Sequence, residues 1–217
     1  MARESTVTKK QRVLRVISLL KRYYPDAHCA LNFETPEQLL FATILSAQCT
    51  DERVNMVTPD LFATYPTLEA MASAKLSDVE RIIQSTGFFR NKAKSLIGSA
   101  QALLEKHNGE MPRSIDELTQ LPGVGRKTAN VVLGNAFQIS SGVVVDTHVR
   151  RLSQRLGFVK AENPEIIERD LGELVPQKHW VMFSHWLISH GRAVCKARSP
   201  RCETCFLTQE CPRKRVE

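Results

Sequence analysis

The chain has 217 residues, enough for one large domain or for two small ones with separate cores. Hydrophobic residues make up 42% and charged residues 24%, and no run approaches the roughly 20 apolar residues of a membrane span. The first ten residues are polar, lack the apolar core of a secretory signal and are expected to form a short disordered tail. The formal net charge of +7 leaves nucleic acid, anionic membrane and acidic protein as partner classes.

Helical signals begin close to the N-terminus and recur through most of the chain. Apolar residues are spaced as on one helix face, with Lys and Arg between them, at Val13, Val16, Ile17 and Leu20. The segment 35–38, Thr-Pro-Glu-Gln, combines a cap residue, a Pro at the first helical position and a Gln that closes a capping box. These signals predict one helix around residues 13–20 and a second that carries the apolar run 39–45.

Further start and stop signals divide the rest of the chain into short helices. The Ser-x-x-Glu pattern predicts helix starts at residues 77–80 and 114–117, and Asn163-Pro164-Glu165 predicts another. Helix ends are expected at glycines: Gly87, Gly109 and Gly157. A last long helix is expected over residues 179–193. Residues 143–145 are three valines after Ser-Ser-Gly and are interpreted as an extended loop, so the predicted fold class is all-α.

Four of the six cysteines fall close together near the C-terminus, in a C-x6-C-x2-C-x5-C pattern: Cys195, Cys202, Cys205 and Cys211. Such clustering without a secretory signal favours a metal site over disulfides. Zinc sites usually use two close pairs of ligands, whereas the wide spacings here fit a loop around a [4Fe–4S] cluster better. Zinc and unligated cysteines remain the alternatives. Three basic residues in the same loop, Lys196, Arg198 and Arg201, favour a role in presenting charge to phosphate.

The string Leu-Pro-Gly-Val-Gly at residues 121–125 lies between two helical stretches, 114–120 and 126–137. Two glycines one residue apart allow a tight turn, and the next helix begins there with its free N–H groups and positive dipole end. A helix–hairpin–helix over residues 114–137 can therefore hold a DNA phosphate without reading bases. The alternative is an ordinary turn between two helices.

Two titratable residues near this hairpin are candidates for chemistry. Lys127 lies in the first turn of the second helix, a position that disfavours an ammonium and so favours the nucleophilic neutral amine. Asp146 follows the extended valines and could cap the next helix or face a cleft. A carboxylate close to Lys127 could take its proton and stabilise a cationic sugar. The alternatives are a solvated lysine and a purely structural cap.

At this point five segments together resemble bacterial endonuclease III of the helix–hairpin–helix DNA glycosylase superfamily. They are LPGVGRKTANVVLG, VVVDTHVRRL, LLFATILSAQCTD, STGFFRNKAKSL and the cysteine loop. The resemblance runs in order from about residue 10 to 213. It implies a six-helix barrel domain over residues 29–138 and a discontinuous domain made of residues 1–28 and 139–217, with a cleft between them and the iron–sulfur cluster in the second.

The resemblance also implies an activity: a bifunctional DNA glycosylase and AP lyase of base excision repair that removes oxidised pyrimidines from duplex DNA. Lys127 would attack the sugar carbon and form a Schiff base, and Asp146 would activate it across the cleft. Gln48 would fill the space left by the extruded base, Phe88 would wedge the opposite strand, and Asp51 matches an acid near the cleft. The alternative for Gln48 and Phe88 is packing in the core or on the surface. Gly123, Val124, Gly125 and Arg126 would contact DNA.

The same resemblance predicts a monomer that binds damaged duplex DNA, in the cytoplasm of a bacterium and associated with the nucleoid. Cys29 and Cys49 are interpreted as buried small residues, and His179, His185 and His190 as packing or surface residues. Two alternative functions remain. One is a monofunctional adenine or mismatch glycosylase, whose members typically lack the lysine. The other is a non-catalytic DNA-binding iron–sulfur protein, for which a Lys127–Asp146 pair would have no use.

Overall fold

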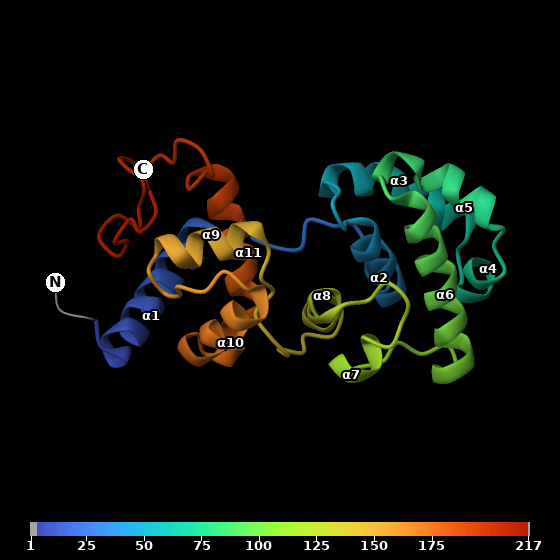
Figure 1. Cartoon of the computed structure of the whole chain (residues 1–217), viewed down its shortest axis with the longest axis horizontal. Helices are drawn as coiled ribbons and strands as arrows, with labels where there is room; N and C mark the ends of the chain where they lie inside the picture. Colours follow the sequence, from blue (N-terminus) through green and yellow to red (C-terminus); the bar gives the residue numbers. More distant parts are fainter. Residues whose placement is uncertain (1–3, 217) are drawn as a thin grey trace. The chain divides into compact units, whose positions relative to one another are not determined.

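The computed structural model describes residues 4–216, and these form α-helices, short 3-10 turns and loops without a strand. The predicted all-α fold class is therefore confirmed. The chain divides into two compact units, one made of residues 1–28 and 140–217 and the other of residues 29–139 (Figure 1). No helix in the described part of the chain is long and apolar enough to cross a membrane.

The continuous unit, residues 29–139, contains most of the helices. In chain order they are α2 (Pro36–Leu45), α3 (Asp51–Thr64), α4 (Leu68–Ala72), α5 (Leu76–Ile83), η1 (Gln84–Thr86), α6 (Phe89–His107), α7 (Ile115–Leu118) and α8 (Arg126–Ala136). Helix α2 is the centre of the unit, since every residue from Leu39 to Leu45 is buried. It packs against α3, α6 and α8, whose apolar side chains surround it.

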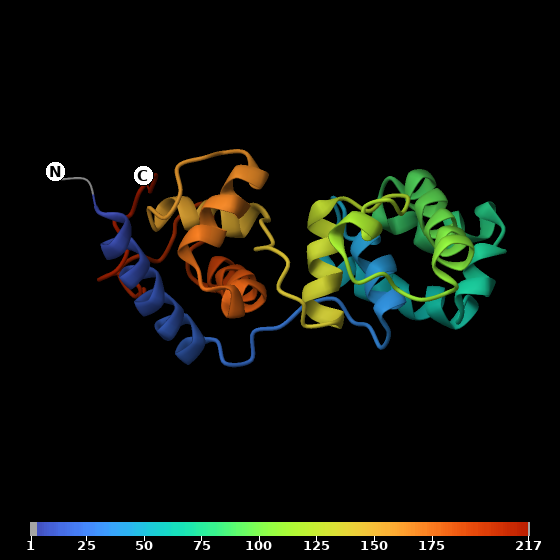
Figure 2. The ribbon, with the colours of Figure 1, turned by 90° about the horizontal axis from the view of Figure 1, so that it is seen from below.

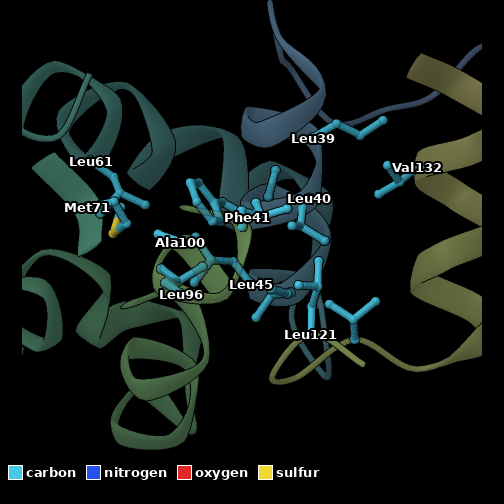
Figure 3. Close-up of a cluster of buried hydrophobic side chains, with 14 of the residues drawn as sticks. Leu39, Leu40, Phe41, Leu45, Leu61, Met71, Leu96, Ala100, Leu121 and Val132 are labelled. Carbon is cyan, nitrogen blue, oxygen red and sulfur yellow. The ribbon is translucent and has the colours of Figure 1, made fainter. Parts of the chain in front are cut away.

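The core of this unit also fixes the hairpin. Leu121, in the loop between α7 and α8, and Val132 of α8 both belong to the same buried cluster as Leu40 and Leu45 of α2 (Figure 3). Their burial attaches the hairpin to the core of the unit, while the two hairpin glycines stay exposed. The position of the hairpin therefore follows from core packing and not from the turn alone.

The discontinuous unit joins the N-terminal helix to the C-terminal half of the chain. It contains α1 (Thr6–Tyr23), α9 (Thr147–Arg155), α10 (Pro164–Leu174), η2 (Gln177–His179), α11 (Trp180–Ala193) and the cysteine loop (Figure 2). The four predicted apolar residues of α1 are all buried and pack with α9, α10 and α11 around Phe183, which is fully buried. A contiguous core thus forms from residues more than a hundred positions apart.

Most of the predicted start and stop signals lie at helix boundaries in the structure. Thr35, Ser114 and Asn163 accept hydrogen bonds as N-cap residues of α2, α7 and α10. Gly87, Gly109 and Gly157 have positive φ values at helix ends, and residues 143–145 form an extended loop. In each case a local side chain or a glycine satisfies the terminal backbone without help from distant residues.

Three local predictions are wrong in detail. Ser77 does not start a helix: α5 begins at Leu76 after Lys75, without a side-chain cap, and Val79 and Ile83 on its apolar face are buried. Gln38 accepts its hydrogen bond from the N–H of Glu34 at 2.8 Å, one residue before the expected cap residue. The expected disordered tail of ten residues is also too long, because Ser5 caps α1 and helix begins at Thr6; residues 1–3 lie outside the described part.

Candidate functional site

The hairpin in the continuous unit presents the predicted DNA-binding residues. Gly123 has a φ of +77° and passes so close to α6 that a Cβ there would lie 2.6 Å from Ser95. Gly125 is the N-cap residue of α8 and offers no side-chain cap. The first N–H groups of α8 therefore need partners from elsewhere, as an anion-binding helix end requires.

Lys127 lies on this helix end. It is exposed in the first turn of α8, next to exposed Arg126, and that turn contains no acidic residue. Val124, by contrast, is buried and donates its N–H to Leu121 O at 3.1 Å, which closes the turn. The hairpin thus combines a buried apolar side with an accessible side that presents Arg126 and Lys127.

Gln48 and Phe88 lie on two other loops of the same unit. Both have left-handed backbones, with φ values of 53° and 49°, a conformation that is uncommon for residues other than glycine. Gln48 is exposed after α2, and the Phe88 side chain is 64% exposed before α6. A large apolar side chain held outward in a strained conformation indicates a binding role.

Three more predicted residues lie nearby in this unit. Asp51 is the first residue of α3 and is half-buried. Cys29 and Cys49 are partly buried and pack against the core rather than lying within it, which corrects the expectation that they are buried. Burial raises the pKa of the Cys29 thiol, with Asp51 acting in the same direction, so this cysteine is held as a neutral thiol.

Asp146 belongs to the other unit, where it caps α9. Its Oδ1 accepts the N–H of Val149 at 2.7 Å, and it lies directly after the extended valines. Burial lowers the pKa of nearby His185 to about 4, against the opposing effect of Asp146. The structure therefore shows the structural role of Asp146, and its pairing with Lys127 stays a prediction.

The four C-terminal cysteines, Cys195, Cys202, Cys205 and Cys211, line one pocket in the discontinuous unit. Among residues 4–216, no group of three or more His, Cys, Asp or Glu could hold a single metal ion. Four thiol ligands that share a pocket but do not converge on one ion-sized point fit a larger iron–sulfur cluster. The donor set present in the chain therefore suits the predicted cofactor.

Two arginines that the sequence analysis did not predict as functional form hydrogen bonds with this loop. Arg155 is buried and donates to the carbonyls of Lys196 and Ala197 at 2.7 and 3.0 Å, and to Cys195 Sγ at 3.4 Å. Arg151 donates to Cys195 O at 3.0 Å. The two arginines are four residues apart on α9, the spacing of one helix face, which is the signal that could have revealed them.

His190 also contacts the cluster loop and is more than a packing residue. Its Nδ1 lies 3.0 Å from Tyr24 Oη and its Nε2 lies 3.4 Å from Cys205 Sγ. Burial lowers its pKa to about 4. Nothing in its sequence neighbourhood indicates this contact, because Tyr24, His190 and Cys205 come from three separate segments.

Comparisons with known proteins test the predicted family and cofactor. The model of the HhH-GPD superfamily of base excision DNA repair proteins matches residues 41–177, and the model of the iron–sulfur binding domain of endonuclease III matches residues 195–211. An endonuclease III of Synechocystis sp. is 57% identical over 94% of this chain and 94% of its own length. That of Escherichia coli K12 is 41% identical over 94% and 97%.

The chain belongs to the endonuclease III family. Membership makes it a base excision DNA repair protein with an iron–sulfur cluster, so the predicted family and cofactor are confirmed and the zinc alternative is set aside.

Solved structures agree with this assignment to the endonuclease III family. A non-covalent endonuclease III–DNA complex superposes with a TM-score of 0.89 at 43% identity, covering 94% of this chain and 95% of that one. A trapped endonuclease III–DNA covalent intermediate gives 0.88, also at 43% identity. A thermostable thymine-DNA glycosylase, at 24% identity and a TM-score of 0.81, shows the same fold.

Proposed function

We propose that the chain is a bifunctional DNA glycosylase and AP lyase that removes oxidised pyrimidines from duplex DNA and cleaves the strand. The observation that carries the proposal is an exposed Lys127 at the start of α8, where the N-cap residue Gly125 has no side chain and the first turn has no acidic residue. A phosphate held by the N–H groups of α8 would place a nearby sugar within reach of the amine. The covalent intermediate trapped for an endonuclease III 43% identical to this chain supports an enzyme-bound step.

The reaction follows from the chemistry of the two residues. The neutral amine of Lys127 attacks the sugar carbon that bears the base, and the base departs with the bonding electron pair. The sugar ring then opens to a protonated Schiff base on Lys127. Loss of a sugar proton expels the 3′ phosphate and breaks the strand. Asp146, as the ionised acid, accepts the proton from Lys127 and stabilises the cationic sugar.

Gln48 and Phe88 provide the access that this chemistry needs. Because the reacting carbon lies inside a stacked duplex, the damaged nucleotide must be extruded first. We propose that Gln48 fills the space that the base leaves and that exposed Phe88 wedges the opposite strand, which offsets the cost of unstacking. Asp51 is proposed as an acid bordering the same site.

A lysine substitution tests the nucleophile. Lys127→Gln should abolish both base release and borohydride trapping on duplex DNA with an oxidised pyrimidine, while duplex binding survives, since only the amine is lost. Lys106→Gln is the matched control, because Lys106 is an exposed lysine in the last turn of α6 and should keep full activity. Normal base release by Lys127→Gln would instead assign the chain to the glycosylases that use water.

An aspartate substitution separates charge from capping. Asn caps helices as well as Asp does, so Asp146→Asn should keep α9 intact and remove only the negative charge. Base release should slow by at least about a hundredfold, the low end for one positioned acid–base group. Cleavage of a pre-formed abasic site should suffer less, because its aldehyde already reacts with the amine. Equal losses on both substrates would contradict the proposed role of Asp146.

Salt dependence tests how the DNA is held. The net charge of +7 and the basic hairpin predict affinity dominated by phosphate contacts. Binding to undamaged duplex should therefore weaken by orders of magnitude between low and moderate salt, if about five or more phosphates are neutralised. A dissociation constant that barely changes with salt would contradict this view of the interface.

A further inference from the structure

Lys92 is a buried lysine in the continuous unit, and no step described so far uses it. It belongs to α6 and is only 5% exposed. Its Nζ donates to Leu45 O at 2.7 Å and to Thr86 O at 2.8 Å. Both of these partners are main-chain carbonyl oxygens rather than carboxylates, so the ammonium is held by backbone dipoles.

The two carbonyls lie at the ends of two different elements. Leu45 is the last residue of α2 and Thr86 is the last residue of η1, where carbonyl groups have no partner within their own helix. A cation is favoured at such ends, because the carbonyl dipoles point toward it. One side chain therefore caps both elements and joins them to α6.

Each of these ends leads directly into one of the exposed, strained residues. Gln48 follows Leu45 by three residues and Phe88 follows Thr86 by two, and both have left-handed backbones. Lys92 also donates its main-chain N–H to Phe88 O at 3.1 Å. Through its side chain and its main-chain N–H, Lys92 therefore hydrogen-bonds to the carbonyls of Thr86 and Phe88, on the two sides of the 87–88 turn. Its side chain also bonds to the carbonyl of Leu45, where the Gln48 loop begins.

Burial of this ammonium is costly, and desolvation lowers the pKa of Lys92. An apolar side chain of similar length would fill the same space without that cost. In addition, the lysine fixes the distance between the carbonyls of Leu45 and Thr86, which belong to two separate loops. Fixed distance matters for residues that must enter one site together.

We propose that Lys92 is a positioning residue that locks the Gln48 loop and the Phe88 loop into one rigid element, so that both side chains enter the DNA at a lesion as a pair. The inference rests on the proposed function, in which Gln48 and Phe88 occupy the two strands. Lys92 itself does not contact DNA, and it acts only through these two residues.

The test uses the full-length protein and a duplex with a tetrahydrofuran abasic analogue opposite 2-aminopurine. The analogue has no aldehyde, so extrusion is measured without chemistry. Lys92→Met should lower the preference for this site over undamaged duplex by about tenfold or more, with a smaller rise in 2-aminopurine fluorescence. Lys94→Met removes the same charge two residues away on α6, from an exposed position, and should behave as wild type.

A double-mutant cycle excludes a merely structural effect. In a Gln48→Ala, Phe88→Ala background, Lys92→Met should cause no further loss of preference, because the residues through which it acts are gone. Equal losses in both backgrounds, or none in either, would overturn the inference. If Lys92→Met does not fold, as judged by circular dichroism, Lys92→Gln enters the same cycle, since its amide can still donate to one carbonyl.

The wild-type protein separates the two levels of the proposal. A wild type that prefers the tetrahydrofuran site, with Lys92→Met indistinguishable from it, overturns the role of Lys92 alone. A wild type without any such preference overturns the proposed function, and this inference with it.

Discussion

The two units of the molecule are stabilised in different ways. The continuous unit is built around α2, whose seven consecutive buried residues are covered by helices from the same 111-residue stretch, residues 29–139. The discontinuous unit cannot complete its core until α1 meets α9, α10 and α11, which lie more than a hundred residues further along the chain. Contacts of such long range delay folding, so we expect the continuous unit to form first.

The cysteine loop is a second difference between the two units. Residues 194–216 contain no helix, and Leu207 is their buried apolar residue. Arg12, Arg151 and Arg155 donate to main-chain carbonyls of the loop, and the four cysteines line a pocket next to these bonds. Because cluster binding contributes to the folding free energy of such loops, we expect the discontinuous unit to depend on its cofactor for stability, whereas helix packing supports the continuous unit.

Loss of the cluster should therefore break one unit and spare the other. Cys202→Ala should release the iron and destabilise the discontinuous unit by at least about 5 kcal/mol, because cluster binding is part of its folding free energy. Both tryptophans, Trp180 and Trp186, lie in that unit, so their fluorescence reports its unfolding selectively. Hydrogen exchange of α2 and α6 should stay unchanged.

Metal analysis provides the accompanying control. Wild-type protein prepared without oxygen should be brown, with about four irons per chain. Stoichiometric zinc without iron, or an unfolding transition of the tryptophans that is the same in Cys202→Ala, would contradict the dependence on the cluster.

Low pH should also lower the stability of the discontinuous unit more than that of the continuous unit. Burial lowers the pKa of His185 to about 4, with His28 acting in the same direction and Asp146 against it. Between pH 6.5 and 4 the unfolded state binds a proton that the folded state does not, so stability is lost as pH falls through this window. The loss reaches up to about 3 kcal/mol at pH 4 for this one histidine.

Thermal unfolding followed by tryptophan fluorescence from pH 7 to 4 measures this loss. His185→Gln should reduce the slope of stability against pH, and His107→Gln, in the continuous unit, should leave it unchanged. A wild-type slope that His185→Gln does not alter would show that other groups carry the acid sensitivity.

The hairpin glycines offer a sharper probe of the continuous unit. Gly123→Ala should destabilise it by about 2 kcal/mol or more, because the backbone is left-handed and the new Cβ would lie 2.6 Å from Ser95. Gly125→Ala meets no atom within 4 Å and should cost at most about 1 kcal/mol, the loss of a good N-cap residue. Hydrogen exchange of α8 compares the two, and equal costs would contradict the close approach.

The smallest expected effects test how helix starts are set. Ser114 caps α7 and Ser77 caps nothing, although both begin the same Ser-x-x-Glu pattern. Ser114→Ala should cost about 1 kcal/mol and Ser77→Ala less than about 0.5 kcal/mol, measured by denaturant unfolding. A larger cost at Ser77 would show that the serine helps to start α5 after all.

The sequence by itself determined the fold class and several helix boundaries, and it favoured an iron–sulfur cluster over zinc. It could do so because these depend on local signals: caps such as Thr35 and Asn163, glycines at helix ends, apolar periodicity in α1, and four cysteines within seventeen residues. Lys127 and Asp146 were marked as candidates because each lies at a helix start that the sequence indicates, and their catalytic roles stay predictions.

Only the tertiary structure decided what the buried polar residues do. Lys92 and His190 look like ordinary surface or packing residues in the sequence, yet one joins two loop ends and the other lies against a cluster cysteine. Their partners, Leu45, Thr86, Tyr24 and Cys205, come from separate segments. Long-range packing decides whether a polar side chain is buried. The periodicity of one helix does not predict which distant carbonyl or thiol will form hydrogen bonds with that side chain.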